Sequence, residues 1–178
     1  MKTLSVIPLL VVAAMSLCLA PAATGQAKTT RPGLHAVAAA TGARMPDFCL
    51  DDLNGHPVCS SQFQGKVLLI DFWASWCGPC KTEMPAYQAF QERYGSRGLV
   101  VIGIGLSMDS PANLKMFARK LGVHYRLLMG TMSIQDKFGL KGIPTTLLVD
   151  RNRVIRRRIV GFDYPSKFTG PIRRALSQ

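Results

Sequence analysis

The sequence predicts an α/β fold in which helices flank a central mixed β-sheet and a β-hairpin precedes it. Three observations carry this prediction. Apolar runs that are typical of buried strands alternate with segments of helical periodicity. A turn signal at residues 52–55 separates two short strand-like segments. Near the C-terminus, a turn at 150–152 joins two strand-like runs, which makes them antiparallel.

Each element has its own local signal. The runs at 67–74 and 99–106 are rich in β-formers, and a crossover helix between them makes them parallel. That helix, 79–94, carries an aromatic stripe on one face and ends at Gly95. The remaining expected elements are hairpin strands at 46–50 and 58–60, a helix from Pro111 to Gly122, a strand at 125–129, a short helix at 134–138, strands at 145–149 and 154–160, and a last helix at 168–176 in which Gly170 and Pro171 favour a break.

The N-terminal residues predict export. Lys2 precedes an almost continuous apolar run at 4–23, which is the pattern of a signal peptide. Small residues follow the run and offer a cleavage site, so we expect residues 1–27 to be removed; an uncleaved membrane anchor is the alternative. Residues 28–44 predict a flexible tether, and 45–178 a single domain. The domain is expected in the periplasm or another extracytoplasmic space, soluble after cleavage or tethered by the apolar run.

The formal net charge is +12, and much of the excess lies in arginines between residues 151 and 174. One interpretation is attraction to an anionic membrane surface or to an acidic protein partner. The other is a solvated strand-and-turn surface. Nucleic acid is not an expected partner, because no aromatic residues alternate with these arginines and an exported chain rarely meets nucleic acid.

Two cysteines, Cys77 and Cys80, stand two residues apart just after a strand-like run. Thiols at this spacing can close a small disulfide ring and reopen it, which is reversible two-electron chemistry that needs no bound cofactor. Cys49 and Cys59 lie on opposite sides of the predicted hairpin. We expect a structural disulfide between them; two free thiols or a second redox pair are the alternatives.

The predicted start of the helix gives the two thiols different roles. Cys77 lies at the N-terminal end, where free N–H groups and the helix dipole favour a thiolate. Since only a thiolate attacks a disulfide, Cys77 is the expected nucleophile. Cys80 lies one turn further along, is expected to be more buried, and resolves the mixed disulfide.

Two carboxylates are candidates for handling the proton of the resolving thiol. Asp71 lies inside an apolar strand, where burial raises the pKa of a carboxyl group. Glu83 follows Cys80 by three residues and therefore shares its helix face. The alternatives are a structural, hydrogen-bonded carboxylate for Asp71 and a solvated helix charge for Glu83.

A proline turn is the third part of the candidate site. A cis bond before Pro144 would leave a backbone edge free to pair with a substrate strand lying over the thiols; the local sequence alone does not fix the isomer. We expect Ile143 and Pro144 to contact the substrate, together with Trp76, Gly78 and Pro79 of the thiol segment.

These segments resemble the thioredoxin superfamily. The residues Asp-Phe-Trp-Ala-Ser-Trp-Cys-Gly-Pro-Cys-Lys at 71–81 are similar to the thioredoxin active-site segment, and Gly-Ile-Pro-Thr-Thr at 142–146 is similar to its cis-proline loop. The entrance at 45–48, the segment 63–67 and Cys-Lys-Thr-Glu-Met-Pro at 80–85 resemble the TlpA/ResA-like branch of exported, often membrane-tethered thiol–disulfide oxidoreductases.

The resemblance implies a thioredoxin-like fold and a reductase of protein disulfides. It also implies an attacking Cys77, a resolving Cys80, an active-site Glu83 and a cis Pro144. The implied partners are a membrane electron donor and disulfide-bearing exported proteins, such as apocytochrome c or copper-site assembly proteins. Two features depart from this branch: Asp71 looks more like thioredoxin proper, and the hairpin cysteines lie outside the general pattern.

Other functions compete with a reductase. A disulfide-donating oxidase is the nearest. A thiol peroxidase shares the entrance hairpin, but its P-x-x-x-T-x-x-C context is missing before Cys77. A copper-site assembly factor is the non-enzymatic alternative; that group usually has three residues between its cysteines and a distant histidine ligand. No metal site is expected, because the three histidines give only weak, separate signals.

Overall fold

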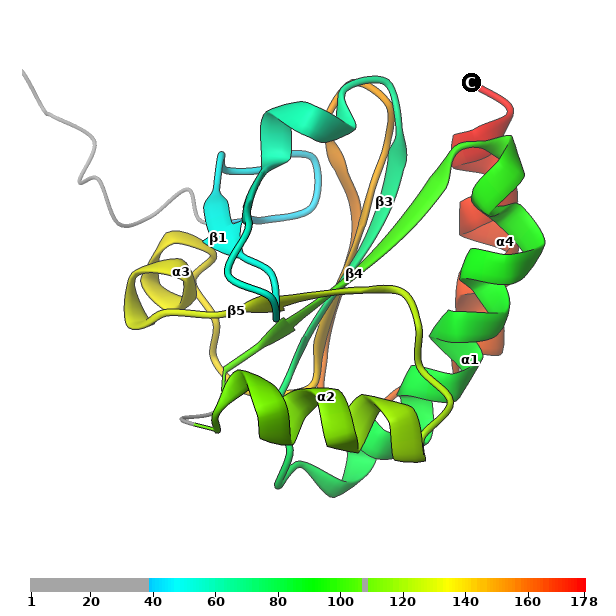
Figure 1. Cartoon of the computed structure of the whole chain (residues 1–178). Coiled ribbons are helices and arrows are strands. Elements are labelled where there is room, and N and C mark those ends of the chain that lie inside the picture. The colour runs from blue at the N-terminus through cyan, green and yellow to red at the C-terminus, as the bar shows by residue number, and fades with distance from the viewer. Residues whose placement is uncertain (1–38, 107–108) are drawn as a thin grey trace, which may run out of the picture. The chain divides into compact units, whose positions relative to one another are not determined.

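The computed structural model describes residues 39–106 and 109–178 (Figure 1). In this part of the chain it confirms the predicted fold class, a thioredoxin-like mixed sheet in the order β5-β4-β3-β6-β7 with a separate two-stranded sheet β1-β2. The elements are β1 (Cys49–Asp51), β2 (Pro57–Cys59), the 3-10 helix η1 (Ser60–Phe63), β3 (Val67–Trp73), α1 (Gly78–Tyr94), the 3-10 helix η2 (Gly95–Arg97), β4 (Leu99–Gly105), α2 (Pro111–Lys120), β5 (Arg126–Met129), α3 (Met132–Lys137), β6 (Thr145–Val149), β7 (Ile155–Val160) and α4 (Ser166–Leu176).

The strand directions follow from the connections. β3 pairs in parallel with β4, and β4 with β5, because α1 and α2 carry the chain back each time. β6 is antiparallel to both β3 and β7, and the predicted tight turn joins β6 to β7. The register sets Asp71 of β3 between Gly103 of β4 and Thr146 of β6.

The two faces of the sheet carry different layers (Figure 1). One face is covered by α1, α2 and α4, and the other by the hairpin, η1 and α3. Side chains alternate along β3, so Leu69 and Trp73 pack under the helices while Ile70 and Phe72 pack on the hairpin side. Burying each such side chain contributes roughly 1.5–3 kcal/mol. Asp71 is the one polar residue of β3, and it lies on the face that α1, α2 and α4 cover.

The ordered domain begins earlier than the predicted boundary at Met45. Ala39 is buried, the Gly42 N–H donates to the Ile155 carbonyl at 2.8 Å, and the Ile155 N–H donates to the Ala43 carbonyl at 2.9 Å. Residues 39–44 therefore pair with the end of the sheet and are not a free tether. The sequence around residues 39–44 does not predict this pairing, because the hydrogen-bond partners of the segment lie more than a hundred residues further along the chain.

No helix within 39–106 and 109–178 has the length and apolar character needed to cross a membrane. The apolar run at 4–23, which predicts a signal peptide or an anchor, lies outside the described residues. So does most of the expected tether, up to residue 38.

α1 ends at Tyr94 with Gly95 as its C-cap residue, as predicted, whereas α4 differs from expectation. Gly95 follows α1 in a right-handed conformation, and the left-handed residue is Gly98, with φ of 101°. α4 runs through Pro171 without the predicted break. Proline has no N–H, so the carbonyl of Lys167, four residues before Pro171, loses its helical hydrogen bond. That carbonyl instead accepts a hydrogen bond from the Arg157 side chain at 3.5 Å. A side chain of β7 thus replaces the lost helical bond.

Part of the late arginine cluster serves the fold. Arg158 donates to the carbonyl oxygens of Ala39, Phe138 and Gly139 at 3.2, 2.9 and 2.8 Å. Arg156 pairs with the buried Asp150 at 2.6 Å. These guanidinium groups satisfy buried acceptors, so the cluster is less available to a partner than its sequence density indicates.

Candidate functional site

The candidate site lies where β3 leads into α1. After β3 the chain turns, and the Cys77 N–H donates to the Ala74 carbonyl oxygen at 3.0 Å. Cys77 is the N-cap residue of α1 and is joined to Cys80 by a disulfide, with Cα atoms 5.4 Å apart. The Cys77 Sγ also accepts a hydrogen bond from the Cys80 backbone N–H at 3.3 Å. The two sulfurs therefore close a ring across the first helical turn.

Gly78 and Pro79 form the first residues of that turn. Proline fits there because the helix leaves this N–H unpaired in any case. The remaining free N–H groups and the helix dipole favour negative charge on the Cys77 sulfur. Cys77 is 4% exposed and Cys80 is 0% exposed. Only Cys77 therefore offers its sulfur to a partner molecule.

Asp71 lies buried on the face of the sheet that α1 covers. Neither of its carboxylate oxygens has a hydrogen-bond partner among the described residues. Burial raises the pKa of Asp71 well above its usual value, and the nearby charge of Glu83 raises it further. Asp71 is therefore not the hydrogen-bonded structural carboxylate of the alternative interpretation. It holds a proton at a pH at which an exposed aspartate has lost it.

Glu83 supplies a second buried carboxyl group, on α1 three residues after Cys80. Its Oε1 accepts a hydrogen bond from the Asp163 backbone N–H at 3.0 Å, and its Oε2 has no partner in the described part of the chain. Burial raises the pKa of Glu83, and the hydrogen bond from Asp163 opposes that effect. Glu83 is therefore not a solvated helix charge.

Two further polar groups meet beside Asp71, at Gly103. A Cβ at Gly103 would stand 3.1 Å from both Trp73 Nε1 and a Tyr125 ring carbon, so the missing side chain makes room for them. In the described residues neither Trp73 Nε1 nor the Tyr125 hydroxyl has a hydrogen-bond partner. Burial, and then the charge of Asp71, raise the pKa of Tyr125 well above its usual value. The sequence alone did not indicate Tyr125, because its approach to Asp71 depends on strand register.

The peptide bond between Ile143 and Pro144 is cis. The Pro144 carbonyl accepts a hydrogen bond from the Gly161 N–H at 2.7 Å, whereas among the described residues no backbone hydrogen bond involves Ile143. The Ile143 side chain packs against the apolar cluster that contains Cys77 and Cys80. The backbone of Ile143 is therefore an edge without a hydrogen-bond partner among the described residues, directly before the cis proline.

Trp76, immediately before Cys77, is 72% exposed. Sequence reasoning missed the loop that follows β7, although Asp163 of this loop bonds Glu83. Phe162 and Tyr164 of the same loop are 45% and 68% exposed. The available signal was the two aromatic residues on either side of Asp163, after the last strand.

Cys49 and Cys59 are directly paired residues of β1 and β2 and are joined by a disulfide, with Cα atoms 4.0 Å apart. The hairpin packs on the face of the sheet opposite α1, so this bond is separate from the Cys77–Cys80 pair. Closing a loop of this length stabilises a fold by roughly 2–3 kcal/mol in the loop-entropy model. This placement fits a structural role.

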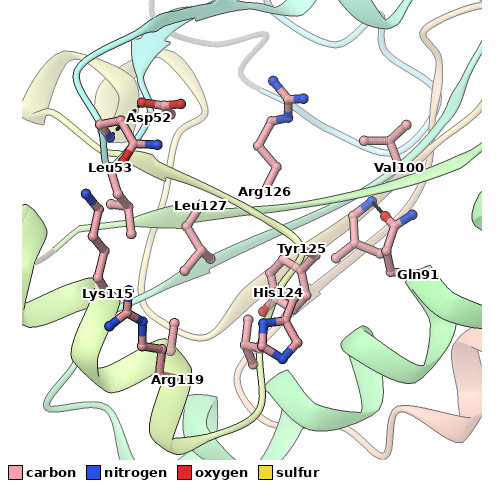
Figure 2. A pocket seen from close by; sticks show the side chains of 14 residues that line it. Asp52, Leu53, Gln91, Val100, Lys115, Arg119, His124, Tyr125, Arg126 and Leu127 are labelled. Atoms are coloured by element: carbon pink, nitrogen blue, oxygen red, sulfur yellow. Dashed lines mark hydrogen bonds between the residues drawn. The ribbon is translucent and has the colours of Figure 1, made fainter.

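A separate pocket of about 650 Å³ is bordered by β5, α2 and the hairpin turn (Figure 2). Lys115, Arg119, His124 and Arg126 line it, and neither cysteine of the α1 pair does. Within the described ranges, no three His, Cys, Asp or Glu side chains converge as metal ligands. A copper-site assembly factor would need a histidine ligand beside its cysteines, and His124 lines this pocket instead.

Comparisons with known proteins agree with this geometry. The model of the AhpC/TSA family matches residues 41–158. The thiol-disulfide oxidoreductase ResA of Geobacillus thermodenitrificans is 29% identical over 125 residues, which cover 70% of this chain and 71% of that protein. The thioredoxin-like protein YneN of Bacillus subtilis is 31% identical over 121 residues, which cover 67% of this chain and 71% of that protein. A structure described as a thiol:disulfide interchange protein DsbE from Chlorobium tepidum matches with a TM-score of 0.72 and 30% identity, over 78% of this chain and 99% of that one.

The burial of Asp71 predicts a pH-dependent gain in stability when its charge is removed. Because the folded-state pKa is raised, the folded protein binds this proton more tightly than the unfolded chain. Stability is therefore lost as the pH rises above the ordinary aspartate value of about 4. We expect Asp71→Asn to raise the free energy of unfolding by about 1–3 kcal/mol at pH 8, and by little at pH 4.

Urea unfolding of the oxidised protein at the two pH values measures this difference. Asp136→Asn is the matched control, because Asp136 is an exposed aspartate on α3 and should show no pH-dependent gain. An equal effect of Asp71→Asn at both pH values would contradict the raised pKa.

Proposed function

We propose that this chain, which belongs to the AhpC/TSA family, acts outside the cytoplasm as a reductase of protein disulfides. It is a thiol–disulfide oxidoreductase of the ResA and DsbE type, and its paired cysteines stand at disulfide distance. One observation carries the proposal: the Cys77–Cys80 ring at the N-terminus of α1, where the dipole favours a thiolate on the accessible sulfur.

The proposed reaction begins with the reduced protein. The Cys77 thiolate attacks one sulfur of a substrate disulfide, so that a mixed disulfide forms and the other substrate sulfur leaves as a thiolate and takes a proton. Cys80 then gives its proton to a buried carboxylate, and its thiolate attacks the Cys77 sulfur. The Cys77–Cys80 bond forms and the second substrate sulfur leaves. The substrate gains two electrons and the protein loses two.

Asp71 and Glu83 are the proposed acceptors of the Cys80 proton. Both are buried, both have raised pKa values, and each keeps an oxygen without a hydrogen-bond partner among the described residues. A carboxyl group whose pKa lies closer to neutrality exchanges a proton with a thiol more effectively than an ordinary one. The same group returns the proton when an electron donor reduces the ring again.

The substrate is proposed to lie across Trp76, Gly78, Pro79, Ile143 and Pro144. The unpaired backbone of Ile143 offers a hydrogen-bonding edge for an extended segment, which is the geometry of strand addition. Strand addition reads main-chain groups and therefore accepts many sequences. This suits an enzyme that acts on more than one exported protein.

Export is supported by two independent features. The N-terminal residues 1–27 have the pattern of a signal peptide, removed or kept as an anchor. The hairpin carries the additional Cys49–Cys59 disulfide, and disulfides persist in oxidising compartments but are rare in the reducing cytosol. A reductase in such a compartment needs electrons from the other side of the membrane.

The proposed partners follow from that location. They are a membrane protein that donates electrons as a dithiol, and exported proteins with disulfides, apocytochrome c and copper-site assembly proteins among them. The formal net charge of +12 supports contact with an anionic membrane surface, at which the donor and the enzyme meet.

The direction of the reaction is tested by the reduction potential of the Cys77–Cys80 pair. We expect a value near −270 mV, as in thioredoxin, since the Gly-Pro dipeptide between the cysteines resembles that of reducing thioredoxins; −120 mV is typical of a strong oxidant. Equilibration with thiol buffers, read by Trp fluorescence, measures it. The Cys49→Ser/Cys59→Ser double variant is the control: because it lacks the hairpin disulfide, any redox change that it still shows belongs to Cys77 and Cys80. A reduction potential near −120 mV would identify a disulfide-donating oxidase instead.

The roles of the two sulfurs are tested by substitution. Cys77→Ser should abolish insulin reduction, because no accessible thiolate remains. Cys80→Ser should accumulate mixed disulfides between Cys77 and its partners, since nothing resolves them; mass spectrometry of the trapped species detects this. The Cys49→Ser/Cys59→Ser variant should keep its activity. Full activity in Cys77→Ser would overturn the assignment.

A further inference from the structure

Exposed apolar side chains gather in the segments that adjoin the redox pair. Among the described residues, the large hydrophobic side chains left exposed are Trp76, Met116, Met132, Val160, Phe162 and Tyr164. Trp76 precedes Cys77, and Val160 ends the strand that pairs with the start of β6. Large apolar groups that cluster on a surface mark interaction sites. Four of these six side chains thus belong to segments that adjoin the redox pair or the cis-proline turn.

The loop after β7, residues 161–164, is bonded to the redox centre at two points. Its Gly161 N–H donates to the Pro144 carbonyl at 2.7 Å, and its Asp163 N–H donates to Glu83 Oε1 at 3.0 Å. Phe162 lies between these two anchors and Tyr164 directly after the second. Their rings meet edge to face, with centroids 5.6 Å apart. The pair therefore has a defined position beside the cis-proline turn.

Charge neutralisation keeps this loop in place. The Asp163 carboxylate accepts a hydrogen bond from the Tyr164 N–H at 2.9 Å and pairs with Lys167 at 2.7 Å and Arg157 at 3.7 Å. The charge of Asp163 is thus largely balanced by these partners. The exposed rings of Phe162 and Tyr164 are then the part of the loop that a ligand can contact. Because the backbone is already fixed, a ligand that packs on the rings loses little free energy in ordering them.

We propose that Phe162 and Tyr164 form a binding subsite for a bulky apolar residue close to the cysteine of a substrate polypeptide. The inference rests on the proposed reductase function and extends it to substrate choice. A folded protein buries such a residue, so the occupant is an extended, unfolded segment. Its main chain pairs at Ile143, and its apolar side chain packs on the aromatic pair. The enzyme therefore selects unfolded chains over folded domains and small disulfides.

Two matched peptides test this subsite. Each carries one cysteine as a mixed disulfide with glutathione, and they differ only in having Phe or Ser beside that cysteine. We expect the wild-type protein to reduce the Phe peptide with a kcat/KM roughly tenfold higher, mainly through KM, as for an aromatic contact at an interface. The Phe162→Ser/Tyr164→Ser variant should lose this preference.

The control is Met132→Ser. Met132 is 81% exposed at the start of α3, which Figure 1 shows beside β5 and away from the start of α1. This variant removes exposed apolar surface elsewhere and should keep the preference. Tyr164→Ser alone provides a second reading if the double variant does not fold, and it should weaken the preference.

The contradicting results are distinct. Reduction of both peptides at equal rates by the wild type, or an unchanged preference in the double variant, would overturn the subsite while leaving the reductase intact. Reduction of neither peptide would overturn the reductase and the subsite together. Conversion of a dimer to a monomer by the loop substitutions, with the preference unchanged, would assign the rings to self-association.

Discussion

The capping of α1 by the sulfur of Cys77 is the interaction on which the rest of the site depends. Between the end of β3 and the start of α1 the chain turns so that this sulfur accepts the Cys80 N–H at 3.3 Å. One helical turn separates the two cysteines, which keeps Cys80 within bonding distance but fully buried. The more accessible sulfur is thus also the one that the helix dipole favours as a thiolate, and the proposed order of attack rests on this helix geometry.

The acids near the helix illustrate a compromise between folding and chemistry. A buried carboxyl group without a hydrogen-bond partner is unfavourable, and burial raises the pKa of Asp71 and of Glu83. The apolar packing of β3 under α1 offsets that cost, with Trp73 and Met84 fully buried. The same burial lets a carboxyl group hold a proton at a pH at which an exposed one has lost it. Glu83 also bonds the loop after β7, which links the acid to the proposed substrate surface.

Local signals in the sequence predict most of the fold, because apolar runs and helical periodicity belong to single segments. The same applies to the two cysteines, whose spacing and position after a strand suffice. What the sequence alone does not indicate depends on distant partners. Tyr125 approaches Asp71 only through strand register, and the Ala39 segment is ordered by pairing next to β7. α4 continues through Pro171, where Arg157 donates to the Lys167 carbonyl that proline leaves without a helical partner.

The pKa of the Cys77 thiol tests the central claim most directly. It can be measured from the pH dependence of alkylation by iodoacetamide in the Cys80→Ser protein, which keeps the N–H at position 80 and the hairpin disulfide. If the helix terminus stabilises the thiolate, the rate should rise with a pKa of about 7 or below. A pKa at or above the ordinary cysteine value of about 8.5 would contradict the account.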